Sequence, residues 1–191
     1  PIVSKMYDVT ILDLATTLEP REIARQILSY EPDIVAYSLY MWNDKEFIES
    51  SNILKQIDPS VKMILGGPQV SYNPIENLER NPQADVVVSG AGESRFVQLL
   101  NCKLDPREML DIPQITFRDE KRQIVSTGGT FKEDVTKIPS PYQNNSVDLY
   151  DGRQHTVLYE TYRGCPFKCS YCIWGDMETK LDLFPIEQVL N

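Results

Sequence analysis

Over the first half of the chain, short apolar runs of strand length alternate with segments whose apolar residues recur at helical spacing. This alternation constrains the fold most. Residues 33–39 (DIVAYSL) are nearly continuous in apolar side chains, as in a strand that is covered on both faces. Further strands are predicted at residues 7–14, 61–65 and 85–89, and helices from Pro20 onward and over residues 45–57, 75–81 and 93–100. Repeated β-α units with short connections predict an α/β fold in which a parallel sheet carries helices on both faces.

The carboxyl ends of these strands carry unusual loops, at residues 38–43 (SLYMWN), 66–70 (GGPQV) and 89–93 (SGAGE). Ligands of open α/β sheets bind beyond the carboxyl ends of the strands, and glycine lets the backbone approach a ligand closely. Gly92 also precedes a helix whose N-terminus can meet an anionic group. A tight β-α turn explains each glycine loop taken alone, whereas three loops at one edge indicate a binding site.

The runs DIVAYSLYMWN, ILGGPQVS and VVVSGAGE resemble the cobalamin-binding domain found in front of many radical S-adenosylmethionine (SAM) domains. This resemblance implies a Rossmann- or flavodoxin-like sheet, with the nucleotide tail of cobalamin beside it and the corrin over the strand ends. For any one of the aromatic residues in these loops, packing of the loop against the core is the alternative explanation. The residues that the resemblance assigns to cobalamin are Ser38, Tyr40, Met41, Trp42, Gly66, Gly67, Pro68, Ser89, Gly90, Gly92 and Glu93.

The chain departs from the mutase and methionine-synthase type of cobalamin domain in one respect. It has no D-x-H-x-x-G loop, and no histidine precedes His155. Residues 7–14 resemble the family's second strand, so we expect the chain to start one β-α unit late. We also expect cobalamin to bind with its nucleotide base displaced from cobalt, no histidine of this chain replacing it, and Trp42 near the lower face.

Three of the four cysteines, Cys165, Cys169 and Cys172, stand at C-x3-C-x2-C spacing after a predicted strand over residues 155–161. A closed zinc site usually takes four ligands in two pairs, and a disulfide would leave one cysteine unpaired. An iron–sulfur cluster accepts cysteine thiolates, and three such ligands would leave one iron of a four-iron cluster open.

The run RGCPFKCSYC, with Tyr171 before Cys172, resembles the cluster loop of the radical SAM superfamily. The resemblance implies that Cys165, Cys169 and Cys172 bind three irons of a 4Fe–4S cluster. The fourth iron would chelate SAM, and Tyr171 would lie near its adenine. Because the chain stops after residues 185–190, a predicted helix, we expect a fragment of a larger enzyme with only the start of a (β/α) barrel; its catalytic residues stay unknown.

The predicted domains are a cobalamin-binding-like domain over residues 1–100, a linker over 101–153 and the truncated radical SAM domain over 154–191. The linker is expected to hold a β-hairpin formed by residues 114–118 and 123–126. Cys102 is expected to be a free thiol.

Composition limits the partners. With 41% hydrophobic and 25% charged residues the chain is globular, and its net charge of −9 disfavours a nucleic-acid partner. Without an apolar run long enough for a membrane or a signal-peptide core, we expect a cytoplasmic protein. The family implies a small-molecule or peptide substrate and an electron donor such as a flavodoxin or ferredoxin.

Both resemblances together imply methyl transfer to an unactivated carbon, with cobalamin as the methyl carrier and SAM as the radical source. Cyclisation or rearrangement within the same family is the alternative. Two other classes stay open: a cobalamin-binding module without catalysis, and a flavodoxin-like or response-regulator-like domain for a different ligand. For the last, Asp13 lies near a strand end, but no paired acidic residues accompany it.

Overall fold

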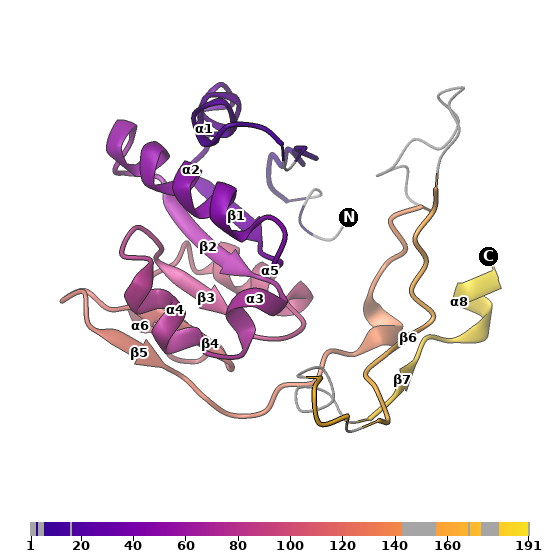
Figure 1. Cartoon of the computed structure of the whole chain (residues 1–191). Helices are drawn as coiled ribbons and strands as arrows, with labels where there is room; N and C mark the ends of the chain where they lie inside the picture. The colour runs from indigo at the N-terminus through magenta and orange to yellow at the C-terminus, as the bar shows by residue number, and fades with distance from the viewer. Residues whose placement is uncertain are drawn as a thin grey trace. The chain divides into compact units, whose positions relative to one another are not determined.

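A sheet with the strand order β1-β2-β3-β4-β5 organises the larger part of the chain (Figure 1). The strands β1 (Ile34–Ser38), β2 (Lys62–Gly66) and β3 (Val86–Val88) are parallel, with Ile34 opposite Lys62 and Ile64 opposite Val86. This confirms the prediction of an α/β fold with parallel strands at these positions.

The predicted hairpin also forms, as β4 (Ile115–Arg118) and β5 (Ile124–Ser126). It does not stand apart from the sheet, because β4 pairs antiparallel with β3 and so extends the sheet. The sequence predicts the hairpin through its turn, but it carries no local signal for the strand against which the hairpin packs.

The computed structural model describes residue 3 and residues 6–15, 17–142, 156–167, 169–172 and 180–190. The chain divides into two compact units. One is Thr10–Glu133, and the other combines Pro1–Val9 with Asp134–Asn191.

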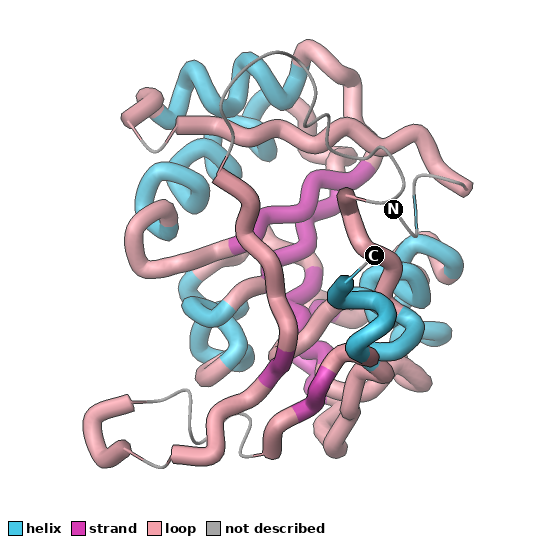
Figure 2. The backbone as a smooth tube through the Cα atoms, turned by 90° about the vertical axis from the view of Figure 1, so that its right-hand side faces the viewer, coloured by secondary structure: helices cyan, strands magenta, loops and turns pink. Residues whose placement is uncertain are grey.

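Helices cover both faces of the sheet, as Figure 2 shows from a second side. The helices α1 (Pro20–Leu28), α2 (Asp44–Ile57) and α4 (Pro74–Arg80) contribute Ile23, Leu54 and Leu78 to one cluster of buried side chains. Alternate residues of β2 point to opposite faces, so Met63 and Leu65 join this cluster.

The other face carries α5 (Glu93–Asn101) and the short α6 (Pro106–Met109). Their Leu99 and Met109 pack with Ile64 of β2 in a second buried cluster. A further short helix, α3 (Pro68–Ser71), directly follows β2; neither α3 nor α6 was expected from the sequence. The three-layer arrangement places the loops after β1, β2 and β3 at one edge.

The strand predicted for residues 7–14 is wrong, because the structure has no strand there. Leu12 and Leu14 pack against the first cluster, whereas Val9 and Ile11 are 39% and 77% exposed. Alternation of buried and exposed side chains is therefore partly present. A strand also needs a backbone ladder partner, and this segment has none among the described residues.

In the second unit, β6 (Tyr162–Arg163) pairs antiparallel with β7 (Asp182–Leu183), and α8 (Ile186–Leu190) follows. The predicted strand over 155–161 is wrong for residues 156–161, which form no ladder; His155 lies outside the described residues. Within this segment the carbonyl of Leu158 accepts a hydrogen bond from the hydroxyl of Tyr142 at 2.6 Å. The 3-10 turn η2 (Val135–Lys137) opens this part of the unit. None of the described helices is long and apolar enough to cross a membrane.

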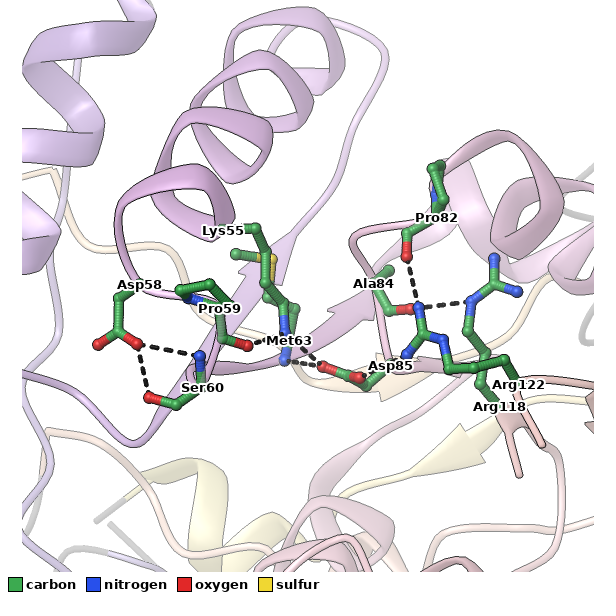
Figure 3. A network of polar contacts seen from close by, with 10 residues as sticks. All are labelled: Lys55, Asp58, Pro59, Ser60, Met63, Pro82, Ala84, Asp85, Arg118 and Arg122. Atoms are coloured by element: carbon green, nitrogen blue, oxygen red, sulfur yellow. Dashed lines mark hydrogen bonds and ion pairs between the residues drawn. The ribbon is translucent and has the colours of Figure 1, made fainter. Parts of the chain in front are cut away.

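A polar network fastens the hairpin to the parallel strands at their amino ends (Figure 3). The carboxylate of Asp85 accepts the N–H of Met63 at 2.9 Å and lies 3.3 Å from the ammonium of Lys55 and 3.4 Å from the guanidinium of Arg122. Arg122 also donates to the carbonyl of Pro82, and Arg118 donates to the carbonyls of Leu78 and Ala84. The side chain of Asp85 is only 13% exposed, so these partners replace most of its water.

We predict that Asp85→Ala lowers the free energy of unfolding by about 2–3 kcal/mol, because it strands a buried amide and the half-buried Lys55. Urea unfolding followed by circular dichroism measures the change. The matched control is Glu76→Ala, which removes the exposed Glu76–Arg80 pair and should cost less than about 1 kcal/mol. Equal losses in the two variants would contradict the role of Asp85.

Candidate functional site

The loops that follow β1, β2 and β3 meet at the carboxyl edge of the sheet. Ser38, the last residue of β1, lies opposite Gly66, the last residue of β2. The next residue, Leu39, continues this pairing because its N–H donates to the carbonyl of Gly66 at 2.8 Å. The structure thus brings together the three loops that the sequence indicates as a binding site.

Asn43, a residue that the sequence analysis did not single out, folds the first loop. Its Oδ1 accepts the N–H of Tyr40 at 2.8 Å, and its Nδ2 donates to the carbonyl of Ser38 at 3.0 Å. The side chain is buried and serves backbone groups that would otherwise lack partners. An asparagine directly before a helix is the local signal that could have identified it.

The first loop carries two stacked aromatic rings, of which Tyr40 is half-buried and Trp42 is exposed. The ring centroids of Tyr40 and Trp42 are 4.6 Å apart, and their planes differ by 13°. Trp42 is 63% exposed and Met41 is 82% exposed. A flat apolar ligand laid on this surface would remove it from water, which is the usual driving force for binding at such a patch.

Gly67 must be glycine for a reason internal to the chain. Its φ is +95°, and a Cβ built there would lie 2.5 Å from the carbonyl oxygen and 2.8 Å from the nitrogen of Leu39. At Gly66 the nearest atom to such a Cβ is 3.9 Å away. Close approach of backbone therefore explains Gly67 without a ligand, whereas a Cβ at Gly66, beside the exposed Ser38, would make only an ordinary van der Waals contact. Pro68 begins α3 at its first position, where proline is favoured.

Ser71 joins the second loop to the third and was also missed. Its hydroxyl donates to the carbonyl of Gly67 at 2.8 Å and accepts the N–H of Gly90 at 3.0 Å. Ser71 is buried, so the hydroxyl is the partner that replaces water for both groups. The contact spans 19 residues of sequence, which is why no local pattern reveals it.

The third loop contains Ser89, Gly90, Gly92 and Glu93. The N–H of Ser89 donates to the carbonyl of Gln114 at 3.1 Å, and Gly90 has a φ of +73°. Gly92 is the N-cap of α5, as expected. The sequence indicates that this helix N-terminus can meet an anionic group, and in the structure the carboxylate of Glu133 lies there, accepting the N–H of Ser94 at 3.1 Å.

The cysteine loop belongs to the second unit. Cys165, Cys169 and Cys172 are free thiols that are half-buried, exposed and exposed, and the N–H of Cys172 donates to the carbonyl of Cys169 at 3.0 Å. Tyr171 is 90% exposed, and Gly164 bends the chain with a φ of +89°. Within the described part of the chain, no three His, Cys, Asp or Glu side chains are arranged to hold a metal ion. Cys102 is a free thiol, as predicted, but it is buried in the core of the sheet unit and does not lie in a surface linker.

Residues 3–100 match the family model of the B12 binding domain. The chain is 32% identical over 152 residues to the cobalamin-dependent radical SAM methyltransferase TokK of Streptomyces tokunonensis, covering 76% of this chain and 22% of that protein. It is 31% identical over 175 residues to an uncharacterized methyltransferase of Pyrococcus horikoshii, covering 90% of this chain and 38% of that protein.

A third relative is the anaerobic magnesium-protoporphyrin IX monomethyl ester cyclase of Synechocystis, at 24% identity over 90% of this chain and 36% of that protein. The fold is similar to the solved structure of the cobalamin-dependent S-adenosylmethionine radical enzyme OxsB with aqua-cobalamin and S-adenosylmethionine bound. That match has a TM-score of 0.67 and 21% identity, and it covers 92% of this chain and 24% of the other. The chain thus spans between about a fifth and two fifths of the length of these relatives.

We predict that Gly67→Ala lowers the free energy of unfolding by about 3 kcal/mol or more, because it adds a backbone clash to the strain of a positive φ. Gly128→Ala is the matched control, with a φ of +61° and no atom within 4 Å of the new Cβ. Since it adds only backbone strain, it should cost about 1 kcal/mol. Thermal or urea unfolding compares the two, and equal losses would show that the approach to Leu39 is not close.

Proposed function

The chain belongs to the B12-binding domain family, and we propose that it is the cobalamin-binding part of a radical SAM enzyme that transfers a methyl group to an unactivated carbon. The observation that carries the proposal is the stack of the exposed Trp42 on the half-buried Tyr40 at the carboxyl edge of a sheet of this family. The methyltransferase relatives support the reaction class.

Cobalamin, when bound, would supply the methyl group, and SAM with a 4Fe–4S cluster would supply the radical that activates the substrate. The residues of this chain would bind the cobalamin and orient it. Trp42 with Tyr40 and Met41 would lie against the corrin and keep water from its lower face. Ser38, Gly66 and Gly67 would border the nucleotide tail, since Ser38 is exposed and Gly66 has no side chain.

The remaining contacts to cobalamin are proposed for the loops after β2 and β3. Pro68 begins the helix beside Gly67, and the hydroxyl of Ser71 fixes the position of the third loop. The residues proposed there are Pro68, Ser89, Gly90, Gly92 and Glu93.

We propose Cys165, Cys169 and Cys172 as ligands of the 4Fe–4S cluster and Tyr171 as a contact of SAM. The chemistry of the donor set fits, because three free thiols can supply three thiolates to iron. Cys169 and Cys172 are exposed and Cys165 is half-buried, so none of the three thiols is enclosed in a core. A thiolate-bound cluster would suit a reducing compartment, and we propose a cytoplasmic location.

The proposed partners are a small-molecule or peptide substrate and an electron donor such as a flavodoxin or ferredoxin. A net charge of −9 disfavours a nucleic acid, and no membrane partner is proposed. A cyclisation or rearrangement is the second candidate reaction, favoured by the cyclase relative at 24% identity.

We predict that the chain binds hydroxocobalamin and that Trp42→Ala weakens binding by about tenfold, through loss of stacked apolar area. Absorbance titration measures the dissociation constant. Tyr30→Ala is the control, since Tyr30 is an aromatic residue of comparable exposure, 56%, beyond the end of α1. No binding by the wild-type chain would refute the proposal.

Electron paramagnetic resonance of the bound cob(II)alamin form supplies a second measurement on the same samples. We expect no superhyperfine splitting from an axial nitrogen and a spectrum that changes in Trp42→Ala. Nitrogen splitting in the wild-type chain would reject the open lower face while leaving cobalamin binding in place.

We predict that anaerobic reconstitution with iron and sulfide loads a four-iron cluster, seen as broad visible absorption. Replacing Cys165, Cys169 and Cys172 together by alanine should abolish this absorption, because it removes every proposed thiolate ligand. Cys102→Ala should leave it unchanged, since that thiol is buried in the sheet unit. Iron retained by the triple variant would contradict the assignment.

A further inference from the structure

The N-terminus of α5 is closed by a residue far away in the sequence. The N–H and the hydroxyl of Ser94 both donate to Oε2 of Glu133, at 3.1 and 2.8 Å. The N-cap residue, Gly92, has no side chain that could accept from the free N–H groups of the first turn. A carboxylate at this end is also favoured by the helix dipole. The connector that follows β5 therefore supplies the cap that α5 itself lacks.

The next residue of the helix, Arg95, is 1% exposed although it carries a charge. Its Nη1 donates to the side-chain oxygen of Gln114 at 3.0 Å, and its guanidinium lies 4.9 Å from the ring centroid of Phe131. Burial lowers the pKa of Arg95, while the charges of Glu133 and Glu93 act in the opposite direction. The same connector thus covers the arginine with one side chain and compensates its charge with another.

Arg95 also supports the loop after β3. The carbonyl of Gln114 accepts both the N–H of Ser89, at 3.1 Å, and Nη1 of Arg95, at 3.4 Å. The other terminal nitrogen, Nη2, lies 3.8 Å from the position that a Cβ of Gly90 would take. The guanidinium therefore lies beside Gly90 and shares the Gln114 carbonyl with the N–H of Ser89.

The connector passes through two glycines with positive φ. Gly128 and Gly129 have φ angles of +61° and +79°, and a Cβ at either would meet no atom within 4 Å. These two residues adopt a backbone conformation natural to glycine. The carbonyl of Gly128 accepts the N–H of Gln114 at 2.8 Å, so the connector is tied here to the strand β4 region. The sheet unit ends at Glu133, and Asp134 begins the part of the chain that carries the cysteine loop.

We propose that Arg95, Phe131 and Glu133 form a clasp that positions the loop of residues 89–92 for cobalamin, and that cofactor binding in return tightens the clasp. The proposal rests on the proposed function of the site. All three are positioning residues, because they act through the loop. Coupling between two sites is reciprocal, so a clasp that improves binding must itself be stabilised by the ligand to the same extent. The clasp also fixes the connector beside the cofactor edge.

The first test follows amide hydrogen exchange in the chain without cofactor. Glu133→Ala should raise exchange about tenfold in peptides covering residues 89–96 and 127–133, because Ser94 loses its acceptor and Arg95 its cover. Glu133→Gln should restore much of the protection, since the amide oxygen can still accept from Ser94. Peptides of β1 and β2 should stay unchanged. The control is Glu120→Ala, which removes a surface pair with Arg107.

The second test titrates the same variants with hydroxocobalamin. Glu133→Ala should bind about tenfold more weakly than the wild-type chain, and Glu133→Gln should lie between them. Adding hydroxocobalamin to the wild-type chain should slow exchange of residues 127–133, a response that a cap with a merely structural role would not give.

The outcomes separate the two proposals. Unchanged exchange in Glu133→Ala overturns the clasp whether or not hydroxocobalamin binds. Faster exchange with unchanged affinity leaves the proposed function standing and overturns the positioning role. Failure of the wild-type chain to bind hydroxocobalamin overturns the proposed function and the positioning role with it.

Discussion

The close approach of Gly67 to the backbone of Leu39 is the contact on which the carboxyl edge of the sheet depends. It lets the loops after β1 and β2 share hydrogen bonds, with Leu39 donating to Gly66 and accepting from Gln69. Ser71 then extends the connection to Gly90. Because each loop is held by its neighbour, the stacked Tyr40–Trp42 pair rests on a fixed base and not on a free loop. The conformational entropy of these loops is already lost when the chain folds. The binding free energy of a ligand is therefore not reduced by the cost of ordering them.

The two edges of the sheet differ in their contacts: those at the amino edge stabilise the fold, and those at the carboxyl edge shape the proposed binding surface. At the amino edge, Asp85 gathers a backbone amide, Lys55 and Arg122 into one network that holds the hairpin against β3. At the carboxyl edge, the contacts are mostly hydrogen bonds to backbone, and the large side chains of the first loop face solvent. The flat apolar surface stands where a large cofactor is proposed.

Much of this arrangement could be predicted from the sequence, because buried parallel strands leave a strong local signal. The run over residues 33–39 predicted β1. The glycine loops predicted that a ligand would bind at the carboxyl edge of the sheet. The segment over residues 7–14 has the same kind of pattern and yet forms no strand, since periodicity says which face is apolar but not whether a ladder partner exists. Ser71 and Glu133 escaped prediction for a related reason. Their partners lie 19 and 39 residues away, and only the folded chain brings them into contact.

The stacked Tyr40–Trp42 pair gives the chain an optical property of its own. Trp42 is one of only two tryptophans and is 63% exposed, so it contributes a large share of the ultraviolet emission from an aqueous environment. A corrin absorbs in the range where tryptophan emits, and a corrin lying on the indole would accept its excitation energy at contact distance. A decrease in the intrinsic tryptophan fluorescence would then report how much of the protein has cobalamin bound at the carboxyl edge, without a label attached to the protein.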